Sequence, residues 1–555
     1  MEALRESMRI DPPALQGLDS RRLRAMVRGI EKESLRVTPE GLLADTPHPL
    51  ALGAALTHPH ITTDYSEAQL ELITGVHAEP EACLRELQDI HQFTCQALDA
   101  QARELLWPAS MPARLPEEDH IPIGRYGRSN VGQAKSVYRL GLGWRYGRRM
   151  QTISGIHYNW SMPGVDSAQY FALIRNFRRH AFLLLVLFGA SPALARDFVA
   201  GRAHGLQELS ESTLYLPHAT SLRMGPLGYQ SEAQARLAVS YNGLDGYAAS
   251  LQEALTRPYP AYEAIGLQGP DGNWRQLATS LLQIENEFYG TIRPKRGIFP
   301  GERPLHALRE RGVEYVEVRL MDLDPFEPVG ISAQTMRFLD IFLLYCLQAD
   351  SPPDTPQEIA RIARNQQLVA GRGREPGLML EGADGPVPLA GWANALLAAL
   401  EPVARRLDEA LAPPATWAGA AEPGSGDLPS GNGRSGEQFS EQPHKSALAA
   451  ARQALAEPER LPSARVLARM AADHGNDFMA FGLAQARQVR AAIAAFPADT
   501  TLRTRFQALS AQSLREQAQI EAADTLPFEE YRRQYTAPER LGLGRQAIAA
   551  GITAA

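Results

Sequence analysis

Residues 29–37 read GIEKESLRV, and this stretch decides the fold that we expect. Successive residues of a β-strand face opposite sides of its sheet, so a strand here presents Glu31 and Glu33 on one side. Two carboxylates so close together repel each other and raise each other's pKa unless a cation neutralises them. A solvated surface strand is the ordinary explanation for one such pair, so a functional interpretation depends on partners elsewhere in the chain.

Composition limits what those partners can be. The chain has 555 residues, of which 44% are hydrophobic, which favours one large core or a core with an appended domain. The formal net charge is −7 and both signs are spread along the chain, so we expect neither nucleic acid nor an anionic membrane as a partner. The longest apolar run, residues 181–190, is too short to span a bilayer, and we expect a cytoplasmic protein.

The hydrophobic patterns mix short alternating segments with helical ones, which predicts an α+β fold with an antiparallel sheet. Strands are expected at 29–37, 67–74, 150–161, 280–290 and 313–322. Helices are expected at 80–105, 166–189, 244–256 and 333–349. The second strand is ambiguous, because a helix there would pair Glu67 with Glu71 one turn apart. No Gly-rich turn of the Rossmann or P-loop type is present.

The composition changes after about residue 411. We expect a catalytic region at 1–411 and then a Pro-, Gly- and Ser-rich disordered insertion at 412–445. Residues 446–555 are rich in Ala, Arg and Leu at helical spacing for most of their length, which predicts a helical C-terminal region packed on the catalytic one.

Several predicted strands carry polar residues on a single face. Residues 150–161 align His157 with Asn159, and residues 313–322 align Glu317 with Arg319. Residues 280–290 align a further set, Gln283, Glu285, Glu287 and Tyr289. Taken singly, each has a structural explanation, such as a cross-strand ion pair or a hydrogen-bonded core histidine.

Together these faces predict a polar-lined interior. A cavity full of carboxylates is unfavourable unless hard cations neutralise it, and oxygen ligands with one imidazole suit Mg²⁺ or Mn²⁺. Protein-bound Mg²⁺ usually shares its ligands with substrate phosphates, which indicates nucleotide chemistry without a P-loop. Lys135 and Lys295 are retained in a chain that strongly prefers arginine, a weak indication that compact charges are needed there.

Seven ordered motifs resemble one family, the bacterial glutamate-cysteine ligases of the proteobacterial type. They are GIEKESLRV, ALTHPHITTDYSEAQLELIT, LWPASMP, QTISGIHYNWS, LPHATSLRM, LLQIENEFYGTIRPKR and VEYVEVRLMDLDPF. The resemblance runs from about residue 22 to near residue 531. It implies membership of the glutamine synthetase superfamily, in which a curled antiparallel sheet forms a funnel surrounded by helices, with metal ions inside.

The resemblance also implies an activity. Members join the γ-carboxylate of L-glutamate to the amine of L-cysteine through a γ-glutamyl phosphate, using ATP and Mg²⁺, with Mn²⁺ as a substitute. The product, γ-glutamylcysteine, is the first intermediate of glutathione synthesis, and glutathione is expected as a feedback inhibitor. No obligate protein partner is implied. A ligase for another amine acceptor stays open, whereas a non-catalytic member would lack acids that are present here. A guanidino-type phosphotransferase would need a phosphagen pocket that we do not find.

Residue roles follow from the matching motifs. The implied metal ligands are Glu31, Glu33, Asp64, Glu71, His157 and Glu317. Arg319 would hold the transferring phosphoryl group, and with Glu317 it forms the expected catalytic pair. The residues implied for glutamate binding are Arg223, Ile153 and Asn159.

The acceptor and nucleotide positions are also implied by resemblance. The expected cysteine pocket consists of Tyr65, Tyr138, Leu142, Tyr229 and Tyr289. Better-known members have Phe at the position of Tyr65. The residues assigned to the nucleotide are Lys135, Arg293, Lys295 and Arg296.

Overall fold

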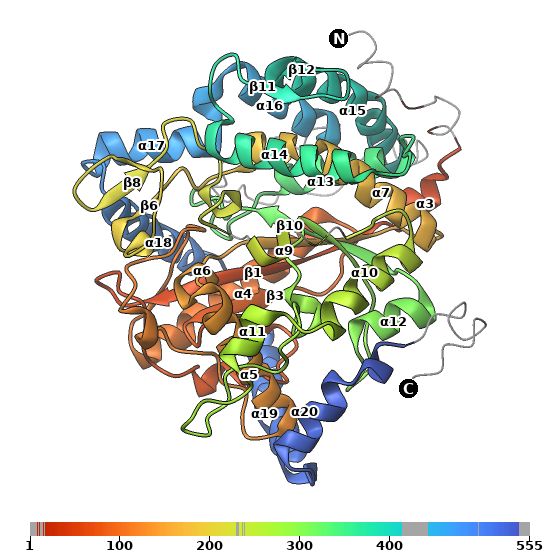
Figure 1. The fold of residues 1–555 in the computed structure, drawn as a ribbon. Coiled ribbons are helices and arrows are strands. Elements are labelled where there is room, and N and C mark those ends of the chain that lie inside the picture. The colour runs from red at the N-terminus through yellow and green to blue at the C-terminus, as the bar shows by residue number, and fades with distance from the viewer. Residues whose placement is uncertain are drawn as a thin grey trace, which may run out of the picture.

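The computed structural model describes residues 17–228, 239–412, 442–497 and 499–542, together with residues 8, 10, 15, 232–235 and 237. At its centre lies a seven-stranded antiparallel sheet that does not close into a barrel within this described part (Figure 1). Strand β1 (Val27–Val37) lies in the middle of the sheet. The order is β2 (Ile61–Thr63), β3 (Gln69–Ile73), β1, β5 (Ile156–Ser161), β10 (Tyr315–Met321) and β9 (Ile292–Lys295), with β4 (Leu105–Leu106) pairing to the end of β1.

One face of the sheet is covered by helices that carry the main apolar core. They include α4 (Pro80–Gln101), α7 (Ser167–His180), α8 (Phe182–Phe188) and α13 (Ala333–Gln348). Lys32 points to this side of β1, where its Nζ lies 2.8 Å from Nε2 of His91 on α4. Helices α14 (Pro356–Arg372), α15 (Leu389–Leu411) and α16 (Pro443–Ala456) extend this layer (Figure 1).

The other face looks onto a wall made of helices from distant parts of the chain. Helix α5 (Asn130–Tyr146) contacts α20 (Phe528–Thr536), and α10 (Leu244–Thr256) contacts α12 (Pro304–Arg311) (Figure 1). Helices α18 (Phe478–Ala494) and α19 (Thr500–Ala523) contact α4, while α17 (Pro462–Asp473) contacts α18. Most of the C-terminal helices therefore contact elements of the first 411 residues.

The predicted strands at 29–37, 67–74 and 313–322 are confirmed as β1, β3 and β10, which also resolves the ambiguity of the second segment. The strand predicted at 150–161 begins only at Ile156, because residues Arg148–Gln151 form the short helix α6. The strand predicted at 280–290 is wrong. That segment is irregular around the 3-10 turn η5 (Glu285–Glu287), and the strand β9 follows it.

The helix predictions differ from the structure mainly at their ends. Helix α10 matches the predicted 244–256, and α13 ends one residue before 349. The helix predicted at 80–105 stops at Gln101, and the one at 166–189 is divided at Ala181 into α7 and α8. Most of the predicted insertion, residues 413–441, lies outside the described residues, as do residues 543–555 of the C-terminal region. Residues 443–445, which we assigned to the insertion, form the first turn of α16.

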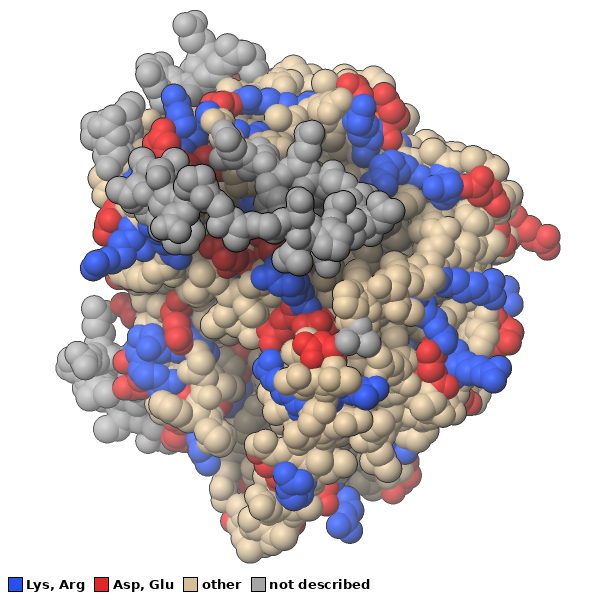
Figure 2. All heavy atoms as spheres, turned by 180° about the vertical axis from the view of Figure 1, so that it is seen from behind, with Lys and Arg blue, Asp and Glu red and all other residues tan. Residues whose placement is uncertain are grey.

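The surface carries charges of both signs. On the face seen from behind, acidic and basic side chains lie in small mixed patches (Figure 2). Among the described helices, none has the length and apolar character that crossing a bilayer requires.

Candidate active site

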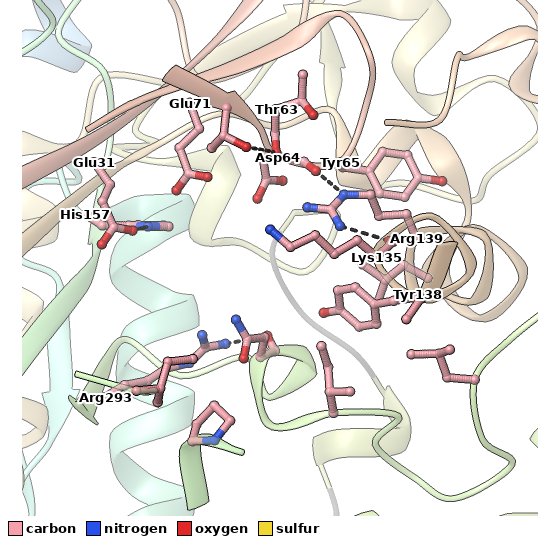
Figure 3. A pocket seen from close by; sticks show the side chains of 18 of the residues that line it. Glu31, Thr63, Asp64, Tyr65, Glu71, Lys135, Tyr138, Arg139, His157 and Arg293 are labelled. Carbon is pink, nitrogen blue, oxygen red and sulfur yellow. Dashed lines mark hydrogen bonds and ion pairs between the residues drawn. The ribbon is translucent and has the colours of Figure 1, made fainter. Parts of the chain in front are cut away.

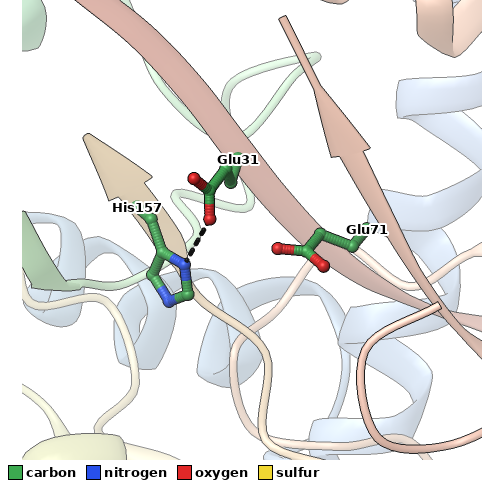
Figure 4. Close-up of side chains that lie close together, drawn as sticks. All are labelled: Glu31, Glu71 and His157. Carbon is green, nitrogen blue, oxygen red and sulfur yellow. Dashed lines mark hydrogen bonds and ion pairs between the residues drawn. The ribbon is translucent and has the colours of Figure 1, made fainter. Parts of the chain in front are cut away.

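A cavity of about 370 Å³ lies between the sheet and α5 (Figure 3). Its sheet side contains a compact acidic cluster with one imidazole. One carboxylate oxygen each of Glu31 and Glu71 and one ring nitrogen of His157 all lie within 4.8 Å of one another (Figure 4). The three side chains converge from β1, β3 and β5, three neighbouring strands.

Strand register brings this cluster together. Glu31 is paired with His157 across β1 and β5, and Glu33 is paired with Glu71 across β1 and β3. Directly paired residues share a face, so these four side chains must meet on one side of the sheet. Nδ1 of His157 lies 3.2 Å from Oε2 of Glu31, and Nε2 lies 3.5 Å from Oε1 of Glu33. Asp64, directly after β2, also lines the cavity.

Glu317 on β10 lies at the border between the acids and a group of cations. Its carboxylate is 3.2 Å from Nζ of Lys295 and 3.2 Å from Nη1 of Arg319. Nη1 of Arg293 lies 3.9 Å away. Burial acts to raise the pKa of Glu317, but these cations and His157 together hold it well below its ordinary value. Glu317 is therefore ionised, with three cations beside it.

Glu33 on β1 and Glu71 on β3 are neutralised less completely than Glu317, although Arg223 and Arg319 act to lower the pKa of Glu33. Burial, together with the charge of Asp64, raises the pKa of Glu33 to about 8. Burial and the neighbouring Glu31, Asp64 and Glu33 raise the pKa of Glu71 well above its ordinary value. The cluster thus holds more negative charge than its protein neighbours offset, which is the condition under which a cation binds.

The donor atoms of the cluster suit a divalent metal ion. Nε2 of His157 is buried and has no hydrogen-bond partner among the described residues. Carboxylate oxygens with a single imidazole match the preferences of Mg²⁺ and Mn²⁺, whereas structural zinc sites rely on several nitrogen or sulfur ligands. The residues present therefore fit a hard divalent cation.

Helix α5 forms the wall opposite the acids. Lys135, Tyr138, Arg139 and Leu142 line the cavity at positions i, i+3, i+4 and i+7, which lie on one face of a helix. Figure 3 shows the Lys135 side chain directed toward Asp64. Burial and the nearby Arg139 lower the pKa of Lys135 to about 8.

Arg139 did not emerge from the motifs. Its Nε donates to the backbone oxygen of Asp64, and its guanidinium lies 4.4 Å from the ring centroid of Tyr126. Because it lies one turn after Lys135, helical spacing from that lysine is the signal that would have identified it.

Four of the five expected acceptor residues line the cavity: Tyr65, Tyr138, Leu142 and Tyr289. Nε2 of Gln151, a further lining residue that the motifs did not indicate, donates to the Tyr289 hydroxyl at 2.8 Å. The fifth expected residue, Tyr229, lies outside the described residues.

Five of the described residues that we assigned to the site are not part of the cavity lining. Glu33 and Asn159 lie at the acidic cluster, whereas Arg223, Ile153 and Arg296 lie away from it. Arg223 is 1% exposed and packs behind Gly155, where its Nη2 donates to the backbone oxygen of Arg319 at 2.9 Å. Ile153 belongs to an apolar cluster. Arg296 donates to the carbonyl oxygens of Arg311 and Gly312 at the end of α12, so the structure does not bring it to the site.

Asn159, the third expected glutamate residue, lies at the cluster. It is half-buried, and its Nδ2 donates to Oε1 of Glu31 at 2.9 Å. Asn159 therefore orients a carboxylate of the cluster, whatever else it contacts.

Much of the remaining cavity lining is apolar or aromatic. It comes from α5, from loops after residue 276, from the start of α12 and from α20, namely Val131, Ala134, Leu277, Ile284, Ile298, Pro304, Tyr531 and Tyr535. Asn286 and Glu302 line the cavity from the same loops. The motifs gave no indication of this part of the lining, because its residues are dispersed and individually unremarkable.

Comparison with known proteins gives a consistent result. The family model described as glutamate-cysteine ligase matches residues 15–369. A glutamate-cysteine ligase from Azotobacter vinelandii is 47% identical over 95% of this chain and 96% of its own length. One from Bordetella parapertussis is 46% identical over 92% and 94% of the two chains.

Solved structures agree with the sequence comparisons. A crystal structure of glutamate-cysteine ligase from Francisella tularensis in complex with AMP superposes with a TM-score of 0.83. It is 34% identical and covers 93% of this chain and 98% of its own. A bifunctional glutathione synthetase from Pasteurella multocida has a TM-score of 0.64 at 23% identity, covering 88% of this chain and 57% of its own, and so shares the fold.

Proposed function

The chain belongs to the glutamate-cysteine ligase family, and from that premise we propose how the cavity between the sheet and α5 carries out the family's reaction. The enzyme joins the γ-carboxylate of L-glutamate to the amine of L-cysteine, converts ATP to ADP and phosphate, and yields γ-glutamylcysteine for glutathione synthesis. The observation that carries the residue assignments is the buried, under-neutralised acidic cluster directly beside Lys295 and Arg319.

The metal ligands in this proposal are the acidic cluster and its neighbours: Glu31, Glu33, Asp64, Glu71, His157 and Glu317. The bound ions are Mg²⁺, with Mn²⁺ as a substitute. When bound, they offset the charge of the triphosphate and of the carboxylates around it. The strands fix the acids in advance, so little reorganisation is needed when the ions bind.

Phosphoryl transfer takes place at the cation group in this proposal. Arg319, Lys295 and Arg293 bind the oxygens of the γ-phosphate while the glutamate γ-carboxylate attacks its phosphorus and the bond to ADP breaks. The cysteine nitrogen then attacks the acyl carbon, loses a proton and releases phosphate. Glu317 holds the three cations in one group, because its carboxylate lies within 3.9 Å of each of them.

For glutamate, Asn159 is the assigned residue with the most direct support, since it lies on β5 within the cluster. Arg223 packs behind Gly155 and Ile153 belongs to an apolar cluster, so their assignment requires that the segment 152–155 moves when glutamate binds. An Arg223→Lys variant tests this requirement, because it should raise the KM for glutamate by at least ~10-fold while the KM for ATP stays the same.

For the acceptor, Tyr65, Tyr138, Leu142 and Tyr289 surround a space that suits a small polarizable thiol. Serine should be a poorer substrate by roughly 10- to 200-fold in kcat/KM, and 2-aminobutyrate should be used well. Adding amino acids one at a time to the protein with ATP, Mg²⁺ and glutamate, and measuring ADP and product, tests this selectivity. A preference for another amine would show that the protein is a ligase with a different acceptor, and the cysteine assignment would be wrong.

Leu142→Ala separates the acceptor side from the glutamate side. It should reduce the preference for cysteine while hydroxylamine still traps γ-glutamyl phosphate at the rate of the unmodified protein. If this variant lost γ-glutamyl phosphate trapping together with its preference for cysteine, the acceptor and glutamate sides of the cavity would not be separate.

Two finer inferences follow from the family. We infer that the open sheet is the curled funnel of the glutamine synthetase superfamily, supported by the convergence of side chains from β1, β3, β5 and β10 on one cavity. We also infer feedback by glutathione, because a γ-glutamylcysteinyl peptide would fill the glutamate and acceptor positions together. Inhibition should then be competitive with glutamate.

A further inference from the structure

A second cavity lies within the helical layer on the face of the sheet opposite the active site. Its volume is about 590 Å³, which is within the range of small-molecule binding sites. It is bounded by the end of α7, the start of α8, helix α14, Trp392 on α15 and the hairpin of β11 (Met379–Glu381) and β12 (Pro386–Pro388) (Figure 1). No described residue lines both this cavity and the catalytic one, so the proposed ligase chemistry does not account for it.

Aromatic and aliphatic side chains make up part of the lining. Phe182 on α8 and Trp392 on α15 meet with ring centroids 4.9 Å apart and an interplanar angle of 55°. Ile362 on α14 and Pro386 on β12 also line the cavity. Nε1 of Trp392 is buried and has no hydrogen-bond partner among the described residues. An indole nitrogen can only donate, so this part of the lining suits the apolar body of a ligand that also carries an acceptor oxygen.

Charged groups of both signs line the cavity, and two of its three arginines are already paired. The charged lining residues are Arg178, Arg179, Asp350, Glu358, Arg361 and Asp384. Arg178 lies 3.1 Å from Asp354, and Arg179 donates to both carboxylate oxygens of Glu358 at 2.9 and 3.1 Å. The two aspartates, Asp350 and Asp384, are exposed, where water screens their charge.

The third arginine, Arg361, has no carboxylate of its own. The described carboxylate nearest to it belongs to Glu358, whose Oε1 lies 3.6 Å from Nη2 of Arg361 and already accepts from Arg179. Glu381 on β11, a strand that contacts α14, is bound by Arg364 instead, at 2.7 and 2.8 Å. One guanidinium at the cavity therefore carries a positive charge that the described acids neutralise only in part.

His180 adds no charge to the cavity. It is 9% exposed, and burial together with the neighbouring Arg179 lowers its pKa to about 3, so the ring is neutral near pH 7. Its Nδ1 is buried and has no hydrogen-bond partner within the described part of the chain. A neutral imidazole can donate or accept, and it leaves Arg361 as the group that sets the charge of a ligand.

We propose that this cavity binds a small aromatic monocarboxylate, with the carboxylate on Arg361 and the aromatic body against Phe182 and Trp392. A guanidinium binds a carboxylate through two parallel hydrogen bonds, and burial of the aromatic body removes apolar area from water. One incompletely neutralised arginine matches one negative charge, whereas a phosphate or a dicarboxylate would need further cations. The proposal is independent of the ligase chemistry, because its residues lie outside the catalytic cavity.

The probe that tests the proposal is 3-phenylpropionate, which has one aromatic ring and one carboxylate. Saturation-transfer NMR should detect it on the full-length protein, and saturating ATP, Mg²⁺ and glutamate should not displace it. The alcohol 3-phenyl-1-propanol and the amine 3-phenylpropylamine have the same body without the negative charge, and each should bind at least ~10-fold more weakly. Displacement of 3-phenylpropionate by glutamate, or tighter binding of the amine, would overturn the proposal.

Two substitutions test the assigned contacts. Arg361→Met removes the charge but keeps an extended side chain, and it should weaken the binding of 3-phenylpropionate at least ~10-fold. Trp392→Phe keeps an aromatic ring without the indole nitrogen and should weaken binding about 2- to 10-fold. Arg372→Met is the matched control and should leave binding unchanged, because Arg372 lies on the same helix, pairs with Glu375 and does not line the cavity.

Folding is measured beside binding. Thermal unfolding should be recorded for every variant, and Arg361→Gln replaces Arg361→Met if that protein does not fold. If the unmodified protein does not bind 3-phenylpropionate, or if folded Arg361 variants bind it as tightly as the unmodified protein does, the proposal is wrong even where ligase activity is confirmed. If the probe binds as expected but no ligase activity is found, the proposed function fails and this second site stands.

Discussion

Two Glu-x-Glu pairs in this protein have the same spacing and opposite surroundings. Glu31 and Glu33 project from β1 onto one face, toward His157 and other acids. Glu285 and Glu287 lie in the 3-10 turn η5, and each binds its own arginine. Glu285 is 2.7 Å from Arg303, and Glu287 is 2.8 Å from Arg145.

The difference shows what converts a buried carboxylate into a ligand. Glu287 also accepts from the Tyr146 hydroxyl at 2.8 Å and from the backbone nitrogen of Gln283 at 2.7 Å. Its carboxylate is therefore satisfied by hydrogen bonds and an ion pair within the protein. Glu33 accepts from the backbone nitrogen of Gly155, and burial with Asp64 raises its pKa. In these two pairs, the acids that have their own arginines stabilise the fold, whereas the acids that face other acids are available to a metal ion.

The largest effect is expected from breaking the structural pair. Glu287→Gln would leave the guanidinium of Arg145, which is 0% exposed, without its counter-charge. Removing one partner of a buried ion pair typically costs about 3–5 kcal/mol, and we expect a loss of that size in the free energy of unfolding. Urea unfolding measures it. A loss below ~1 kcal/mol would mean that the pair is not structural.

The matching change in the other pair should act on activity. Glu31→Gln keeps the size of the side chain and removes a charge from the acidic cluster. Burial and Glu317 act to raise the pKa of Glu31, but His157 and Lys295 hold it below its ordinary value, so the loss of this charge should lower the stability of the metal-free protein slightly without preventing folding. Turnover should fall by at least ~100-fold, because bound metal supplies several kcal/mol of charge stabilisation. ADP formation at saturating Mg²⁺ checks this, and near-normal rates would exclude Glu31 as a ligand.

A smaller effect should appear in the pH dependence of stability. The pKa of Glu33 is raised to about 8 in the folded protein, so between its ordinary value and pH 8 the folded state holds a proton that the unfolded state has lost. Stability from this group is therefore lost as pH rises through that window, by up to about 1.4 kcal/mol per pH unit.

The comparison that isolates Glu33 is with Glu33→Gln, which mimics the protonated carboxyl. Unfolding in EDTA should fall more steeply with pH for the unmodified protein than for this variant, and added Mg²⁺ should reduce the difference. Parallel pH profiles would show that Glu33 is already ionised in the metal-free protein.

The smallest effect is expected at Arg296. Its neighbour Lys295 binds Glu317, whereas Arg296 donates to carbonyl oxygens of α12, so Arg296→Met should change turnover and the KM for ATP by less than about twofold. Lys295→Met is the matched control and should lower turnover strongly. An equal loss in both variants would restore the nucleotide role that the motifs assigned to Arg296.

The sequence alone predicted strands and site residues correctly where the alternation of side chains along a strand agreed with the chemistry of the residues on one face. Strand β10 carries packing residues on one face and charged residues on the other, and β1 carries Glu31 and Glu33 on a single face. These patterns predicted both strands and the convergence of Glu31, His157 and Glu317. Segment 280–290 has the same alternation, but its acids are held by Arg145 and Arg303, whose positions depend on helices far away in the sequence. No local pattern distinguishes the two cases.

Other site residues were missed or misassigned from the sequence for different reasons. Arg139 follows Lys135 by one helical turn and was within reach of a helical-spacing argument. Arg296 was grouped with Lys295 because both belong to one basic run, but Arg296 lies just after β9 and donates to the carbonyl oxygens of Arg311 and Gly312. Tyr531 and Tyr535 are spaced as on one helix face, but only tertiary packing decides what that face contacts.

The central position of β1 has a consequence for how the protein is made. Glu31 on β1 is synthesised before its partner strand β5, before the cations on β9 and β10, and before α20. A growing chain therefore carries crowded acids before it has Lys295 and Arg319 to balance them. Folding from the N-terminus therefore cannot complete the site until β9, β10 and α20 have been synthesised, and a chain that is released before them holds the acids without the cation strands and without one wall of the cavity.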